Sequence, residues 1–237
     1  KLVSSVRDAR AVGDTLNRAG YSVSIVENGT QAAIREALGK FAAKAERSEV
    51  AIVYFAGTGY RIEGNDFIAA TDTASDKDRL ALAGVAVEEF VRSVEGAAAL
   101  GLVIVDACRE NTPEPKRAIT RSPRDRYRSE GFDRHLTRDF AEANGVPAYR
   151  AMIEEPPEYV PVSLKRMPQA LDVVVLYSTE PGSLARDGNS GLSPFAAAFV
   201  DLLQSPGVVL GDFLPTLRDR VIRDTQGFQR PYFEGSW

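Results

Sequence analysis

Apolar residues follow helical spacing over the first part of the chain and strand-like spacing shortly after it. The first helical pattern ends at Gly20. Residues 21–27 (YSVSIVE) then alternate between polar and β-branched side chains, which predicts a strand. Asn28-Gly29-Thr30 is a turn signal that leads into a second helix. The apolar positions of the two helices are Val6, Ala9, Val12, Leu16 and Ala19, followed by Ile34, Leu38 and Phe41.

Three later segments are apolar almost without interruption, which is typical of strands covered on both faces of a sheet. They are residues 49–57 (EVAIVYFAG), 100–108 (LGLVIVDAC) and 171–179 (LDVVVLYST). Residues 66–72 (DFIAATD) are predicted to form one arm of a hairpin. Strands that alternate with helices predict an α/β fold, in which a mostly parallel sheet lies between layers of helices. In such sheets, functional groups gather at the carboxyl ends of the strands.

Helical spacing returns near residues 87–94 and twice after the third apolar strand. Ser193-Pro194 is predicted to open the first of these last two helices, because proline is favoured in a first helical turn. The apolar positions of the three helices are Val87, Phe90, Val91 and Val94, then Phe195, Phe199, Leu202 and Leu203, then Phe213, Leu214, Leu217 and Val221.

Residues 109–170 break this pattern, because they are rich in arginine and proline and show little periodicity. Their first part, residues 109–138, carries nine basic and five acidic side chains. We interpret residues 109–170 as a long insertion or loop. It is either a solvated linker or a regulatory segment, and the pattern favours neither.

Composition limits the possible partners and cofactors. A chain of 237 residues with 44% hydrophobic residues can form one domain with a substantial core, and a net charge of −4 gives no reason to expect nucleic acid or an anionic membrane as partner. No apolar run is long enough to span a membrane, so we expect a soluble, cytoplasmic protein. The single cysteine, Cys108, excludes an internal disulfide. With His135 as the single histidine, we expect no metal site and no cofactor.

Two segments with reactive or glycine-rich character follow neighbouring apolar strands: FAGTGY at 55–60 and DACREN at 106–111. Taken alone, Cys108 is more often a buried structural residue than a nucleophile, since free cysteine is among the most buried residue types. The glycines at 57 and 59 also allow a nucleotide-binding loop as an alternative. That loop would lack the third glycine of a dinucleotide fingerprint and the lysine of a phosphate-binding loop.

Several motifs in a fixed order resemble the caspase-like cysteine peptidases, and among them the bacterial metacaspase-like proteins, or orthocaspases. The family signatures YFSGHG, DACR and YST-x-x-G leading to SPF correspond here to YFAGTGY, LVIVDACREN and LYSTEPGSLARDGNSGLSPF. The likeness extends to VRDARAVGDTLNRAGY near the start and TQGFQRPYFEGS near the end. It implies one caspase-like domain over residues 1–237, a three-layer sandwich with helices on both faces of a mostly parallel sheet.

The resemblance also implies an apolar first strand that is absent from these 237 residues. Its absence would leave buried backbone groups unpaired unless something else fills its place.

The resemblance further implies roles for individual residues. Cys108 would be the nucleophile, and the backbone amides of Cys108 and Gly59 would form the oxyanion hole. Asp8 and Asp106 would line a pocket that selects arginine or lysine, so the expected partner is a peptide or protein with an exposed basic side chain, bound by a monomer. Without the resemblance, Asp8 could be a solvated residue of the first helix and Asp106 a cap at the end of the sheet.

The main departure from the family is Thr58, which stands between two glycines where the family has its catalytic histidine. A threonine hydroxyl does not titrate near neutral pH and cannot protonate a leaving amine. We therefore expect a pseudopeptidase, either natural or made by an engineered histidine-to-threonine change. The alternative is a working arginine- or lysine-directed endopeptidase whose acid is Tyr60 or His135.

Overall fold

The computed structural model describes residues 4–62, 64–73, 84–108, 110–111, 173–185, 191–205 and 210–235. Of residues 110, 111, 210 and 211 it describes the backbone alone. Apart from residues 110 and 111, the predicted insertion at 109–170 lies outside the described residues, and so does His135. Within the described residues, no helix combines the length and the apolar character that crossing a membrane requires.

The central sheet has the strand order β1-β5-β7-β8. β1, β5 and β7 are parallel to one another, and β8 pairs antiparallel with β7. This confirms the mostly parallel sheet predicted from the three apolar runs. The strands are β1 (Val50–Gly57), β5 (Leu100–Ala107), β7 (Val173–Tyr177) and β8 (Tyr232–Gly235).

A second, smaller sheet has the order β4-β3-β2-β6 and continues the chain beyond β1. β3 pairs antiparallel with β2, which confirms the predicted hairpin. β6 pairs parallel with β2, so two residues that we assigned to the irregular insertion belong to a strand. These strands are β2 (Gly59–Ile62), β3 (Asn65–Ala69), β4 (Gly84–Ala86) and β6 (Glu110–Asn111).

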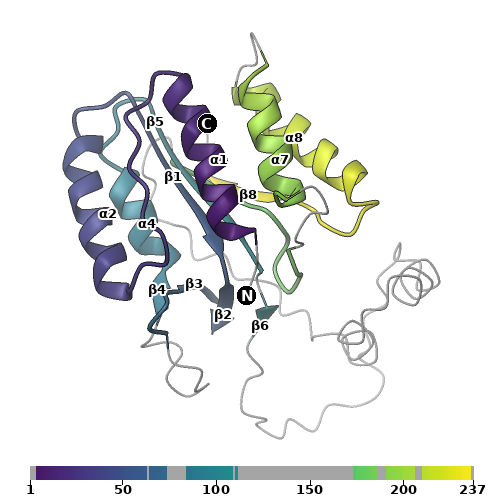
Figure 1. Ribbon diagram of the computed structural model, residues 1–237, viewed down its shortest axis with the longest axis horizontal. Coiled ribbons are helices and arrows are strands. Elements are labelled where there is room, and N and C mark those ends of the chain that lie inside the picture. Colours follow the sequence, from purple (N-terminus) through teal and green to yellow (C-terminus); the bar gives the residue numbers. More distant parts are fainter. Residues whose placement is uncertain are drawn as a thin grey trace, which may run out of the picture. The chain divides into compact units, whose positions relative to one another are not determined.

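Helices cover both faces of the central sheet, as predicted (Figure 1). α1, α7 and α8 pack on one face, where their apolar side chains meet Leu102 and Ile104 of β5. α2 and α4 pack on the other face, against Val103 and Val105. The alternation of side chains along β5 thus supplies two cores, one on each face. The helices are α1 (Ser5–Arg18), α2 (Gln31–Ala45), α4 (Val87–Val94), α7 (Pro194–Leu203) and α8 (Leu210–Asp224).

Polar residues fix where two of these helices begin. The Thr30 hydroxyl accepts a hydrogen bond from the amide of Ala33, and the Ser193 hydroxyl accepts one from the amide of Ala196. Each is an N-cap that satisfies an amide left without a partner in the first helical turn. Pro194 follows its cap directly, as the sequence predicted.

The strand predicted at residues 21–27 is wrong, because the structure forms no strand there. The segment leaves α1 and passes that helix at Gly13, where Val23 and Ile25 lie within van der Waals distance. None of the described strands lies in a ladder with it, and a strand needs a neighbour to receive its hydrogen bonds. An alternating sequence was therefore not enough to make residues 21–27 a strand.

Candidate active site

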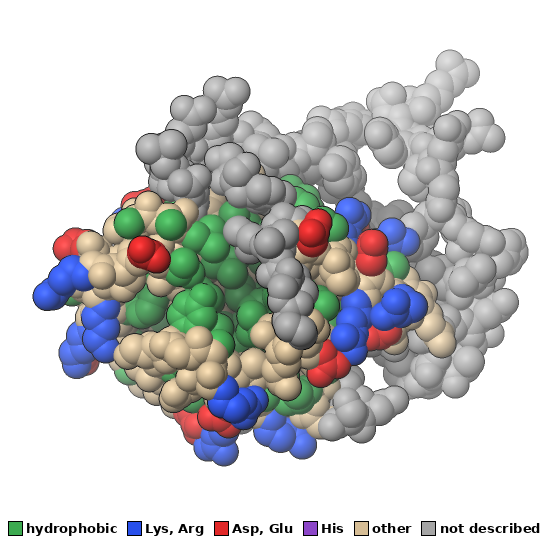
Figure 2. Space-filling model, turned by 90° about the horizontal axis from the view of Figure 1, so that it is seen from above, with side chains coloured by type: hydrophobic (Ala, Val, Ile, Leu, Met, Phe, Trp, Pro, Cys, Tyr) green, Lys and Arg blue, Asp and Glu red, His purple; other side chains and the backbone are tan. Residues whose placement is uncertain are grey.

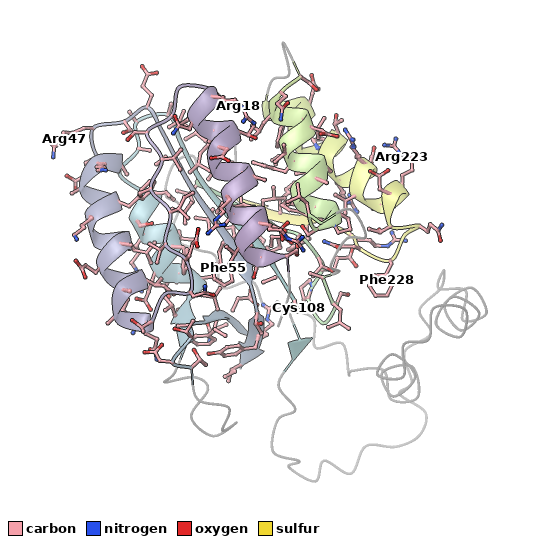
Figure 3. The ribbon with its side chains drawn as sticks, in the orientation of Figure 1. Arg18, Arg47, Phe55, Cys108, Arg223 and Phe228 are labelled. Carbon is pink, nitrogen blue, oxygen red and sulfur yellow. The ribbon has the colours of Figure 1, made fainter. Side chains whose placement is uncertain are left out.

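Pairing between β1 and β5 brings the glycine-rich segment at 55–60 and the cysteine-containing segment at 106–111 to one edge of the central sheet. The last paired residues are Gly57 and Ala107, which lie opposite each other in parallel strands. Thr58 and Cys108 directly follow these two strands, so both lie at the carboxyl edge of the sheet, where functional groups gather. Figure 3 shows Cys108 at this end of the sheet.

Cys108 is partly exposed and forms no disulfide. Its thiol donates a hydrogen bond to the carbonyl oxygen of Ala185, with 3.7 Å between sulfur and oxygen. Because this contact uses the thiol proton, it suits the protonated form of the residue rather than the thiolate, which is the nucleophile. Cys108 is therefore accessible for chemistry, but this contact does not activate it.

Gly59 lies so close to Cys108 that no side chain fits between them. A Cβ atom added to Gly59 would stand 2.6 Å from the carbonyl oxygen of Cys108 and 3.2 Å from the Cβ of Ala107. Glycine at this position thus lets the loop backbone approach the cysteine backbone. The chain then continues into β2 and not into a helix. The loop therefore lacks the helix N-terminus on which nucleotide phosphates usually bind, which removes the basis for the nucleotide-binding alternative.

Thr58 is exposed, and its backbone carbonyl accepts a hydrogen bond from the amide of Ala69 at 2.8 Å. Tyr60, two residues further on, is buried and stacks on Phe67 with 5.8 Å between ring centroids. Its phenol oxygen lies against Gly84, on the far side of β3 from β2. Burial raises the pKa of the Tyr60 phenol, which makes it still less suited to exchange a proton near neutral pH.

Asp8 and Asp106 are brought together by one residue, Ser193. The amide of Ser193 donates to Oδ1 of Asp8 at 2.8 Å, and its hydroxyl donates to Oδ2 of Asp106 at 2.6 Å. Tyr54 also donates to Oδ2 of Asp106, at 3.0 Å. Asp8 and Asp106 are each 1% exposed. The fold thus brings Asp8 and Asp106 together, and their role in binding a basic side chain stays a prediction.

The buried position of Asp106 disfavours the charged form of its carboxyl group. Burial raises its pKa to about 6, since water is excluded from the carboxylate. The hydrogen bond from Ser193 lowers the pKa and the charge of Asp8 raises it, and both effects are smaller than that of burial. Oδ1 of Asp106 is buried and accepts no hydrogen bond of good geometry among the described residues, while the nearby Ser178 hydroxyl also lowers the pKa of Asp106. Burial and the nearby carboxylates also raise the pKa of Tyr54, which therefore stays protonated as a donor.

Two members of this cluster, Tyr54 and Ser193, were missed by sequence reasoning as site residues. Ser193 carried a signal, because it was identified as the residue before a helix-opening proline. That signal predicted the N-cap but could not reveal that the same hydroxyl also donates to Asp106. Tyr54 gave no signal, since it lies within an apolar strand.

A mostly parallel sheet between helix layers, with a partly exposed cysteine at its carboxyl edge, is the arrangement of a caspase-like cysteine peptidase. The chain matches the family model of the caspase domain, within the C14 peptidases, over residues 1–236. It therefore belongs to the caspase domain family. No curated protein matches the chain.

Proposed function

We propose that this chain is a catalytically impaired caspase-like domain of the metacaspase or orthocaspase type, which binds a peptide or protein partner through an exposed arginine or lysine. The observation that carries the proposal is Thr58, which directly follows β1 at the same edge of the sheet where Cys108 follows β5, and which has no group that titrates near neutral pH. Without a neighbouring base only a small fraction of a cysteine is thiolate near neutral pH, and without an acid no side chain donates a proton to the departing amine.

The proposed pocket for a basic side chain is supported by Oδ1 of Asp106, which is buried without a well-formed hydrogen bond among the described residues. A guanidinium carries paired donors that match carboxylate oxygens, and its positive charge would offset the cost of two adjacent buried carboxylates. An acidic side chain would meet repulsion from both. Since Asp8 and Asp106 are each 1% exposed, a guanidinium reaches them only by displacing the atoms that now cover them.

The rival proposal is a working arginine- or lysine-directed endopeptidase with an unconventional acid. The buried phenol of Tyr60, lying against Gly84, gives that rival no support. His135 lies outside the described residues, so it is addressed by mutation. If His135→Ala removed a measurable cleavage activity at arginyl bonds, the rival would replace our proposal.

Restoring the missing histidine tests the impaired function directly. The 237-residue chain and its variants Thr58→His and Thr58→Asn are compared on fluorogenic arginyl and lysyl peptides. One general acid-base contributes about 10²–10⁴-fold, so Thr58→His should raise kcat/KM by about that factor. Thr58→Asn is the matched control, since it adds a polar side chain without a titrating group. Equal activity in all three proteins would refute the proposal.

Labelling with an arginyl chloromethyl ketone tests whether cysteine and pocket act on the same ligand. We expect the reagent to alkylate Cys108 of the Thr58→His variant faster than its alanyl counterpart does. Asp106→Asn should remove that preference while leaving the reaction with iodoacetamide unchanged. If the arginyl and alanyl reagents react equally fast, the pocket does not select basic side chains.

A further inference from the structure

Ser193 makes a hydrogen bond with each of its backbone and side-chain polar groups. Its amide donates to Oδ1 of Asp8 at 2.8 Å, and its hydroxyl donates to Oδ2 of Asp106 at 2.6 Å. The same hydroxyl accepts from the amide of Ala196 at 2.9 Å, and the backbone carbonyl accepts from the amide of Ala197 at 2.9 Å. Ser193 is 2% exposed, so these bonds are shielded from water.

The bond from Ser193 to Asp106 is not needed for capping α7. An N-cap side chain only has to accept a hydrogen bond from the first helical turn. Thr30, the N-cap of α2, accepts from Ala33 in this way, and no hydrogen bond of the described residues joins the Thr30 hydroxyl to a carboxylate. A serine hydroxyl carries one proton, and in Ser193 this proton is directed to Asp106. The donor of Ser193 therefore has a role apart from the cap.

Two donors hold the same oxygen of Asp106. Ser193 at the start of α7 and Tyr54 in β1 both donate to Oδ2, at 2.6 and 3.0 Å. Because these bonds come from two different elements, they fix the rotation of the carboxyl group. Oδ1 is then the oxygen without a well-formed hydrogen bond among the described residues. It is the atom of Asp106 that can accept from a ligand.

Ser193 also sets the distance between two carboxyl groups. Asp8 belongs to α1 and Asp106 to the end of β5, so they lie far apart along the chain. They are bound by the amide and the hydroxyl of one residue, and the short serine side chain keeps these two donors close together. Two buried carboxylates near each other repel. The two donors of Ser193 offset that repulsion and hold both carboxyl groups in place.

We propose that Ser193 is a positioning residue of the pocket for a basic side chain. Its amide and hydroxyl hold Asp8 and Asp106 in one arrangement, in which Oδ1 of Asp106 accepts from the N–H groups of the ligand. Ser193 does not itself contact the ligand and acts through the two carboxyl groups. This inference rests on the proposed function, since it concerns the pocket proposed there. The arrangement favours binding because the ligand does not have to order carboxyl groups that are already held.

The opposite end of the sheet has a different charge pattern. Figure 2, viewed from the end where β1 begins, shows hydrophobic side chains in a hollow, with acidic and basic side chains interspersed around it. Neighbouring opposite charges largely cancel at a distance, so the described side chains on that face form no acidic patch that would compete for a basic ligand. A change at Ser193 can therefore be measured without competition from that face.

The surroundings of Asp106 add a dependence on pH. Burial raises the pKa of Asp106 most strongly, and the hydrogen bond from Ser193 is the largest effect that lowers it. The charge of Asp8 on α1 raises this pKa, while the hydroxyls of Ser178, after β7, and of Tyr54, in β1, lower it. Removing the Ser193 hydroxyl should therefore raise the pKa of Asp106 above about 6, so that its carboxylate forms only at higher pH.

Alkylation of Cys108 by two reagents tests the proposal. In the Thr58→His background, arginyl and alanyl chloromethyl ketones are compared by their second-order rate constants, and we call the ratio of the two the arginyl preference. This ratio does not depend on the ionisation of the thiol, because both reagents react with the same sulfur. At neutral pH, Ser193→Ala should lower the arginyl preference about tenfold, the effect expected for losing a hydrogen bond to a charged group.

Three further variants separate positioning from helix capping. Ser193→Thr keeps the hydroxyl and should keep the arginyl preference. Ser193→Gly lacks the hydroxyl but is tolerated better than alanine at an N-cap, so it should lose the preference even if Ser193→Ala folds poorly. Thr30→Ala removes the corresponding cap of α2 and should leave the preference unchanged.

The pH dependence of the arginyl preference is a readout that a loss of stability does not imitate. In the protein that retains Ser193, the preference should fall as pH drops through about 6, because Asp106 becomes protonated. In Ser193→Ala and Ser193→Gly, the fall should occur at a higher pH.

The possible failures have different meanings. An arginyl preference that is the same with and without the Ser193 hydroxyl would overturn the positioning role and leave the proposed pocket standing. An equal loss in Thr30→Ala, or a lowered preference whose pH profile has not moved, would do the same. Equal rates for the two reagents in the protein that retains Ser193 would instead refute the pocket itself, and the positioning role with it.

Discussion

Replacing Asp106 by asparagine should change how stability depends on pH. The folded-state pKa of Asp106 is about 6, above the ordinary value of 3.8. The folded protein therefore holds this proton more tightly than the unfolded chain, so Asp106 makes folding less favourable as pH rises from about 4 to about 6. Above that range the loss is complete and constant.

The size of the effect follows from the two pKa values. At about 1.4 kcal/mol per pKa unit, a folded pKa of about 6 against 3.8 gives a total loss of about 3 kcal/mol. Between pH 4.5 and pH 7 about 2 kcal/mol of this is lost, because part of the carboxyl population of the unfolded chain is already ionised at pH 4.5. Asp106→Asn removes the titration. Its amide oxygen can still accept from Ser193 and Tyr54, while its NH₂ takes the place of Oδ1.

Urea denaturation at several pH values from 4.5 to 7 measures this difference. The free energy of unfolding of the unsubstituted protein should fall by about 2 kcal/mol relative to Asp106→Asn across this range. A constant offset between the two proteins has no bearing on the result, since it reflects altered hydrogen bonds. Asp14→Asn, which removes an exposed carboxylate of α1, is the control for losing one negative charge away from this cluster. Parallel curves for Asp106→Asn would refute the raised pKa.

Two further substitutions test the geometry of the site and of the core. Gly59→Ala places a methyl group against the carbonyl of Cys108, so we expect a loss of about 1–3 kcal/mol and an altered rate of Cys108 alkylation by iodoacetamide; an unchanged rate and stability would contradict the close approach. Phe199 is 1% exposed and packs with Phe195 and Phe213, so Phe199→Ala should cost about 3–5 kcal/mol in urea denaturation. A loss below about 1 kcal/mol would mean that this core is loosely packed.

Much of the central architecture was predictable because it depends on local patterns. Uninterrupted apolar runs predicted β1, β5 and β7, and Ser193-Pro194 predicted the start of α7. The last strand, β8, was missed, because Tyr232–Gly235 is short and follows a proline without clear alternation. Residues 21–27 have the pattern of a strand but pair with none of the described strands, so the alternating sequence did not by itself produce a sheet.

The sequence alone determined the chemical inventory of the site: one cysteine, a threonine between two glycines, and two aspartates far apart along the chain. Only the tertiary structure decided that Asp8 meets Asp106 through Ser193 and that the phenol of Tyr60 is buried against Gly84. The physical reason is that side-chain identity and spacing are local properties. Burial, hydrogen-bond partners and pKa shifts arise between residues that the fold brings together over long separations in sequence.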